Sequence, residues 1–114
     1  MYTQKSIITF DEFSKSDLCI GRVLECKDVT GSEKLFMLHV DFGQQIGIRT
    51  IYAGLRPWYK KSQLMGKKFV FVVNLPPRKM PGGESNGMML VIENGDNYLL
   101  LPAPKNSVEG ARLC

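Results

Sequence analysis

Short apolar segments rich in β-branched and aromatic residues recur along the chain, separated by glycine, proline or asparagine. The run KKFVFVVNL, residues 67–75, is the strongest, because its centre consists only of valine and phenylalanine, which favour strands. In residues 35–42 apolar side chains recur at every second position. This spacing predicts a strand with one apolar face, formed by Phe36, Leu38, Val40 and Phe42. Strands at this spacing, with little helix between them, predict a small closed antiparallel barrel.

Further strands are predicted at residues 17–29, 46–55, 87–93 and 97–103. In the first of these the apolar pattern changes phase after Gly21, which predicts a bulge or a sharp bend. The last two are joined by the turn sequence NGDN. The predicted fold class is therefore all-β, a five-stranded OB-fold Greek-key barrel with short helical turns. An SH3-like barrel is the alternative on pattern alone.

Short helical turns are expected at residues 9–15 and 56–66. In the first, Thr9 and Glu12 have the spacing of a capping box. Phe10 and Phe13 share a face there, and we expect both rings to pack on the body of the domain.

The length and the rare residue types exclude several classes of protein. A chain of 114 residues fits one domain, and no apolar run approaches the ~18 residues of a membrane span. Three cysteines without a CxxC pair, and a single histidine, His39, argue against a disulfide framework, a metal site and most catalytic constellations. We expect a cytoplasmic protein that is no enzyme and needs no cofactor.

Basic residues are concentrated in one acid-free stretch. The 42 residues between Asp41 and Glu84 contain no acid, yet they include Arg49, Arg56, Lys60, Lys61, Lys67, Lys68, Arg78 and Lys79. A segment of one charge sign attracts polyanions, of which nucleic acid is the commonest in cytosol. The alternative is a solvated basic face balanced by acids from elsewhere in the fold.

The stretch NLPPRKMPGGESNGMMLVI, residues 74–92, combines stiff and polar elements. Pro76 and Pro77 restrict the backbone, so that Arg78 and Lys79 are presented with little entropy to lose when they grip a phosphate. Asn74, at the end of the preceding strand, carries a donor and an acceptor that could read a base edge.

The second half of this loop offers small polar groups. Gly82 and Gly83 let the chain turn back, and Ser85 and Asn86 present a hydroxyl and an amide that can approach a nucleotide closely. The alternative is that these residues only shape a long hairpin and satisfy its backbone. Among the nearby aromatic residues, Trp58 is the best candidate for stacking on a base. Met88 is expected to serve packing.

With these strands and this loop, the chain resembles the tRNA-binding domain family over nearly its whole length. The matching stretches are ITFDEFSKSDLCIGRVLE, VDFG, LMGKKFVFVVNLPPRKM and ESNGMML. This OB-fold module occurs free-standing, at the C-terminus of bacterial methionyl-tRNA synthetases, and in the endothelial monocyte-activating polypeptide II group. The resemblance implies one tRNA-binding OB-fold domain, residues 1–114, that binds tRNA by shape and backbone without catalysis. It also implies a homodimer that assists an aminoacyl-tRNA synthetase.

Carried over by position, the RNA-contacting loop of the family falls on Asn74, Arg78, Lys79, Ser85 and Met88. The resemblance thus assigns Met88 to RNA contact rather than packing. The chain departs from the family pattern in three places. Cys19 stands where the family usually has arginine, Pro76 replaces a frequent lysine, and Gly83 replaces an apolar residue. The last change is expected to loosen the loop.

The stretches VDFGQQIGIR and NLPPRK also resemble the CsaA-type export chaperones, whereas SNGMML is closer to the tRNA binders. These chaperones share the fold and the dimer but are associated with unfolded or secretory polypeptides. The alternative function is therefore polypeptide binding at an exposed apolar groove near Trp58 and the methionines. A third hypothesis is an assembly module that docks on a synthetase, its basic surface incidental.

Overall fold

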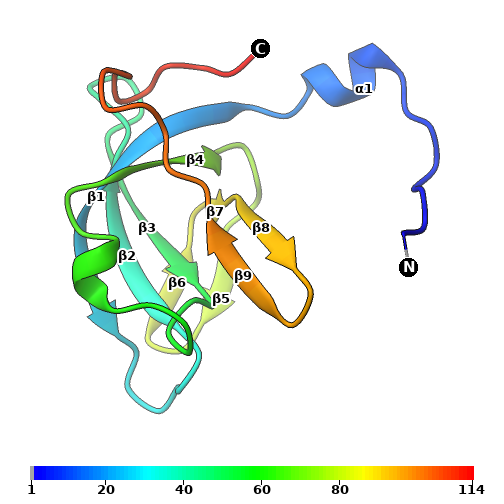
Figure 1. Cartoon of the computed structure of the whole chain (residues 1–114). Coiled ribbons are helices and arrows are strands. Elements are labelled where there is room, and N and C mark those ends of the chain that lie inside the picture. The colour runs from blue at the N-terminus through cyan, green and yellow to red at the C-terminus, as the bar shows by residue number, and fades with distance from the viewer. Residues whose placement is uncertain (1) are drawn as a thin grey trace.

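Five antiparallel strands curve into a nearly closed barrel (Figure 1). The computed structural model describes residues 2–114. The strands lie in the order β3-β2-β1-β4-β7, with bounds β1 (Leu18–Asp28), β2 (Phe36–Asp41), β3 (Ile48–Ala53), β4 (Lys68–Val72) and β7 (Met88–Met89). This arrangement confirms the predicted all-β class and is consistent with an OB-like barrel.

Smaller elements decorate this barrel. They are α1 (Phe10–Ser14), η1 (Lys61–Gln63) and two separate two-stranded hairpins, one of β5 (Arg78–Met80) and β6 (Gly83–Ser85), the other of β8 (Val91–Asn94) and β9 (Asn97–Leu100). Residues 87–93 were predicted as one strand and form two. Met89 still pairs with Phe71 of β4, whereas Val91 pairs with Leu100 of β9. The chain therefore changes partner between Met89 and Val91.

The long strand β1 bends as predicted. Its register against β2 shifts between Val23 and Glu25, so that Leu24 is the extra residue of a bulge. Gly21 lies just before the bulge, and a Cβ there would come within 2.5 Å of a Val40 methyl and 2.6 Å of the Phe42 ring. Because residue 21 is a glycine, the side chains of Val40 and Phe42 can pack directly against the backbone of β1.

The core follows the predicted alternation. Phe36, Leu38, Val40 and Phe42 are all buried, and so are Phe69 and Phe71 of β4. The rings of Phe42 and Phe71 meet edge to face with their centroids 5.2 Å apart. Fully burying such a side chain contributes about 1.5–3 kcal/mol, so these rings are a main source of stability.

The two edge strands of the sheet, β3 and β7, are joined by the segment that lies between β6 and β7. The Asn86 N–H donates to the Thr50 carbonyl at 2.8 Å, and the Tyr52 N–H donates to the Ser85 hydroxyl at 3.0 Å. Gly87 follows with a φ of +135°. A Cβ at Gly87 would lie 3.0 Å from the Val72 carbonyl oxygen. Closure of the barrel thus needs a bare backbone at this point.

The N-terminal arm, residues 2–17, departs from the prediction. The capping box of α1 is present, since Thr9 Oγ1 accepts from the Glu12 N–H and Glu12 Oε1 accepts from the Thr9 N–H. The two rings, however, do not pack on the domain: Phe10 is 80% exposed and Phe13 49% exposed. The reason is that α1 projects beyond the barrel (Figure 1) and buries none of its residues.

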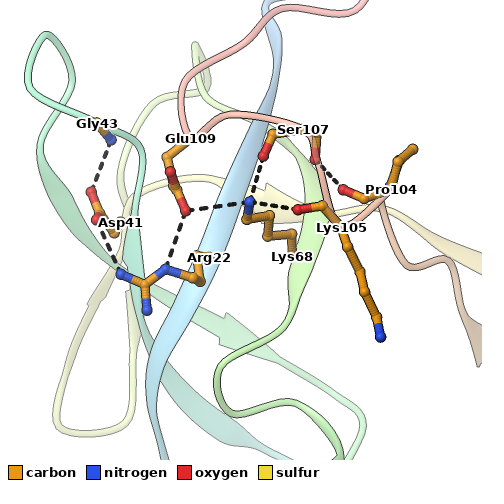
Figure 2. Close-up of polar contacts among 8 residues, drawn as sticks. All are labelled: Arg22, Asp41, Gly43, Lys68, Pro104, Lys105, Ser107 and Glu109. Carbon is orange, nitrogen blue, oxygen red and sulfur yellow. Dashed lines mark hydrogen bonds and ion pairs between the residues drawn. The ribbon is translucent and has the colours of Figure 1, made fainter.

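The C-terminal segment lies across the start of β1. The Ile20 N–H donates to the Ala111 carbonyl at 2.9 Å, and the Gly110 N–H donates to the Ile20 carbonyl at 2.8 Å. Figure 2 shows the charged groups that hold this segment. Glu109 accepts from Arg22 Nε at 3.2 Å and lies 3.7 Å from the Lys68 ammonium. The carboxylate thus links the segment to β1 and β4.

We predict that Gly87→Ala destabilises the domain by about 1–3 kcal/mol. Alanine is strained at this backbone conformation, and its methyl group would lie too close to the Val72 carbonyl oxygen. Gly95→Ala is the matched control, since Gly95 also has a positive φ, +62°, but nothing lies within 4 Å of the position that its new methyl would take. Urea unfolding of both variants measures the difference. Equal losses of unfolding free energy would contradict a tight closure at Gly87.

A second prediction concerns pH. A hydrogen bond from its own backbone, with Lys68 and Arg22 nearby, lowers the pKa of Glu109 below the ordinary value of 4.5. A carboxylate whose pKa is lowered by folding contributes stability above its unfolded pKa, and this contribution is lost as pH falls through the folded value. The melting temperature of the wild type should therefore exceed that of Glu109→Gln at neutral pH. This difference should disappear as the pH falls below about 4.5.

Thermal melts between pH 3 and 7 measure this difference. Glu93→Gln is the control, because Glu93 is exposed and has no ion-pair partner within 4.0 Å among residues 2–114. A difference in melting temperature between wild type and Glu109→Gln that stays constant over the whole pH range would contradict this role of the Glu109 carboxylate.

Candidate nucleic-acid interface

The predicted basic loop is an ordered β-hairpin. Its strands β5 and β6 pair antiparallel, with Arg78 opposite Ser85 and Lys79 opposite Glu84. In Figure 1 the hairpin lies next to β3 at one end of the barrel. Pro76 and Pro77 precede β5 and fix the backbone that leads into it. The loop thus shapes a hairpin, as the structural alternative predicted, and it presents two cations, whose contact with nucleic acid stays a prediction.

The hairpin is attached to β3 through Tyr52. The Tyr52 hydroxyl donates to the Pro81 carbonyl at the hairpin tip, 3.0 Å away, and the Tyr52 N–H donates to Ser85 Oγ. Sequence reasoning placed Tyr52 in a strand and counted it among the aromatic residues that could stack on a base, but gave it no role in holding the hairpin. No local signal identifies its role, since its partner lies 29 residues further along the chain.

Arg78 and Lys79 are exposed. Within residues 2–114, neither side chain has an ion-pair partner within 4.0 Å. Even Glu84, directly across the hairpin from Lys79, is not within that distance of it. Both cations are therefore available to an anionic ligand, on a backbone that is already ordered.

Other cations of the acid-free stretch are partly neutralised by acids outside it. Arg56 and Lys61 both approach Asp28, at 3.5 and 3.3 Å, and Lys68 approaches Glu109. Arg49 donates to the Val73 carbonyl at 2.5 Å. The alternative of a balanced basic face thus holds for three of the eight cations, while the hairpin keeps its charge.

Asn74 lies at the end of β4, where its side-chain amide is already engaged. Its Oδ1 accepts from the Asp17 N–H at 2.8 Å, and its Nδ2 donates to the Lys15 carbonyl at 2.5 Å. These two bonds tie the linker between α1 and β1 to the barrel. A base edge would compete with them for the same amide.

Ser85 and Asn86 lie where the barrel closes. Ser85 is buried, and its hydroxyl accepts from the Tyr52 N–H and donates to the Gly87 carbonyl at 3.1 Å. Asn86 is half-buried, and its backbone bonds Thr50. The structure therefore gives both residues a role in positioning the hairpin, and their contact with RNA stays a prediction.

The remaining candidates are apolar. Met88 is 47% exposed, whereas the adjacent Met89 is buried against the core. Trp58 is 39% exposed and meets the ring of Tyr98 edge to face at 5.3 Å. Met88 thus offers an exposed apolar surface next to β4, and the partly exposed Trp58 ring packs against Tyr98.

Cys19, which stands where the resemblance leads us to expect arginine, lies in the core with 1% exposure. Burial, reinforced by a hydrogen bond to Asp17, raises the pKa of its thiol. The nearby cation is instead Arg112, whose Nε lies 3.1 Å from Asp17 Oδ1. An arginine of the C-terminal segment thus lies beside Cys19 and pairs with Asp17.

The fold and the hairpin together define a small OB-like barrel with a basic edge. Residues 18–112 match the family described as "Putative tRNA binding domain". The chain therefore belongs to the tRNA-binding domain family, as the sequence resemblance predicted. In residues 2–114, no helix is long and apolar enough to cross a membrane.

The relatives include methionine–tRNA ligases. The enzyme of Pyrococcus horikoshii is 39% identical over 106 residues, which cover 93% of this chain, and that of Chloroherpeton thalassium is 45% identical over 101 residues, which cover 89%. The chain spans only 14% of the length of either relative. It is therefore homologous to one domain of these synthetases.

Solved structures share the whole fold. A methionyl-tRNA-synthetase-related protein of Pyrococcus horikoshii superimposes with a TM-score of 0.91 at 38% identity, over 96% of this chain and 100% of the other. The CsaA chaperone protein of Picrophilus torridus superimposes with a TM-score of 0.86 at 32% identity, over 95% and 100%. Both branches that the sequence resembles are thus present among the structural neighbours.

Proposed function

We propose that this protein binds tRNA by shape and backbone, through the β5–β6 hairpin and the adjacent barrel face, without catalysing a reaction. The observation that carries the proposal is the exposed pair Arg78 and Lys79, free of ion pairs within residues 2–114 and fixed on an ordered hairpin. Membership of the tRNA-binding domain family supports the choice of tRNA among polyanions.

The six candidate residues divide into two roles. Arg78 and Lys79 grip phosphates, the first through a planar fork and the second as a compact charge. Met88 provides an exposed apolar contact for a sugar or base. Ser85 and Asn86 hold the hairpin from which the two cations project, Asn74 ties the linker before β1 to the barrel, and the polar atoms of all three border the bound RNA.

The proposed partner besides tRNA is an aminoacyl-tRNA synthetase in the cytoplasm. Methionine–tRNA ligases contain the homologous domain as a part of their own chain. A protein that binds tRNA and also associates with a synthetase raises the effective concentration of tRNA near the enzyme.

A second candidate function is the binding of unfolded polypeptides. It is favoured by the similarity to two solved CsaA chaperones, at TM-scores of 0.84 and 0.86. The exposed apolar side chains Trp58 and Met88 would supply its contact surface. Ionic strength distinguishes the two functions, because phosphate binding weakens steeply with salt and apolar binding does not.

We predict that Arg78→Ala with Lys79→Ala weakens tRNA binding by up to about thirtyfold, since each exposed charge contact contributes up to about 1 kcal/mol. The slope of log K against log salt should fall by about 2, one unit for each lost phosphate contact. Fluorescence anisotropy of labelled tRNA at several salt concentrations measures both quantities.

The control for this prediction is Lys34→Ala with Lys105→Ala, which removes the same charge from exposed positions outside the acid-free stretch. If both double variants bind tRNA equally well, the hairpin is not the site. If the wild-type protein binds RNA weakly and captures an unfolded polypeptide efficiently, the chaperone function replaces the tRNA function.

We also propose that the protein forms a homodimer through its N-terminal arm. The arm exposes Ile7 by 90% and Phe10 by 80%, and Phe13 and Leu113 line a cavity of about 600 Å³ between the arm and the barrel. Apolar exposure on this scale marks an interaction surface. A second copy, with its own arm exposed in the same way, supplies a matching apolar surface.

Phe10→Glu with Phe13→Glu should therefore convert the dimer into a monomer, because two carboxylates cannot be buried in an apolar interface. Sedimentation equilibrium measures the mass of the variant and of the wild type. Met65→Glu, another exposed apolar position outside the arm, is the control and should leave the dimer intact. A wild-type monomer, or a dimer unaffected by the arm variant, would contradict this interface.

A further inference from the structure

The basic hairpin is too short to be rigid by itself. β5 and β6 contain three residues each, and all but Met80 and Ser85 are exposed. A two-stranded hairpin is marginally stable at best in water even when it is longer. The order of Arg78 and Lys79 must therefore come from contacts between the hairpin and the barrel.

Tyr52 of β3 contacts the β5–β6 hairpin at its tip and at its base. Its hydroxyl donates to the Pro81 carbonyl at the tip, and its backbone N–H donates to Ser85 Oγ at the base, each at 3.0 Å. The tyrosine itself is 8% exposed, so its ring is held by the barrel. If a buried tyrosine hydroxyl loses its hydrogen-bond partner, water does not readily replace that bond.

Gly83 makes room for this contact. A Cβ on Gly83 would lie 3.0 Å from the Tyr52 hydroxyl oxygen, which is closer than side-chain atoms normally approach. The family resemblance led us to expect that a glycine here loosens the loop. The structure shows that the space is occupied from β3, by the hydroxyl that bonds the hairpin tip.

We propose that Tyr52, in combination with Gly83, is the positioning residue that holds Arg78 and Lys79 ready for phosphate. This inference rests on the proposed function. Tyr52 carries no charge and contacts the hairpin backbone rather than a ligand. It acts by reducing the order that the hairpin must gain when RNA binds.

The first test is Tyr52→Phe, which removes only the hydroxyl. Amide hydrogen exchange in residues 78–85 should become faster. Affinity for tRNA should fall by about threefold to tenfold, the usual effect of one lost bond and of lost preorganisation. The salt slope should stay unchanged, because no phosphate contact is removed. A loss of slope would mean that Tyr52 acts on the ligand itself, and would overturn the proposal.

Tyr59→Phe is the matched control. The Tyr59 hydroxyl donates to the Tyr98 carbonyl at 2.9 Å and accepts from the Leu100 N–H at 3.3 Å, so it anchors the other hairpin, β8–β9, in a comparable way. Its removal should lower thermal stability about as much as Tyr52→Phe but leave tRNA affinity unchanged. Equal losses of affinity in the two variants would overturn the proposal, because the effect would then be one of general stability.

A double-mutant cycle tests the pairing with Gly83. Gly83→Ala should weaken tRNA binding in the wild-type background, since the methyl displaces the hydroxyl, and should have little further effect in Tyr52→Phe. Additive effects would overturn the coupling. If the wild-type protein does not bind tRNA, the proposed function fails, while exchange in residues 78–85 still decides whether Tyr52 holds the hairpin. Unchanged exchange in Tyr52→Phe overturns the proposal in either case.

Discussion

The junction between β3 and β7 is the contact on which both the barrel and its basic edge depend. β3 and β7 are the two edges of the five-stranded sheet, and residues 85–87 connect them through bonds to Thr50 and Tyr52. Ser85 is at once the last residue of β6 and one of the closing residues. The position of the hairpin and the closure of the barrel are therefore a single structural feature, and a change at this junction alters both.

Local patterns in the sequence predicted the parts of the fold that depend on neighbouring residues. The period-2 core face of β2, the strand β4, the bulge in β1 and the capping box of α1 are all confirmed. The predicted packing of the α1 rings was wrong, because a capping box fixes where a helix starts and not where it docks. The split of residues 87–93 was missed for a similar reason. Met88 and Met89 pair with β4 across the intervening β5–β6 hairpin, whereas the residues from Val91 onward pair with β9, and an apolar run does not show where the partner changes.

The candidate site shows the same limit for charge and for polar groups. Counting acids and bases identified the cationic stretch, but Asp28 and Glu109, which pair with three of its cations, lie outside it in sequence. The sequence predicted a stiff backbone under the hairpin cations, and the structure places both of them on paired strands. What the sequence did not reveal is the source of the stiffness, since the prolines fix only the entry to the hairpin, whereas Tyr52 fixes its tip.

This division of roles bears on which residues of the fold are free to contact a ligand. Solved structures of a synthetase-related protein and of CsaA chaperones share the architecture, with TM-scores between 0.84 and 0.91. In this chain Ser85 closes the barrel and Asn74 ties a linker to it, so both residues serve the architecture itself, which does not by itself decide what is bound. Under the proposed function, the side chains that decide are those that the architecture leaves free, which on this hairpin are the cations of β5. Because they are held by contacts made elsewhere, the ligand can change through a few exposed residues while the barrel beneath them stays the same.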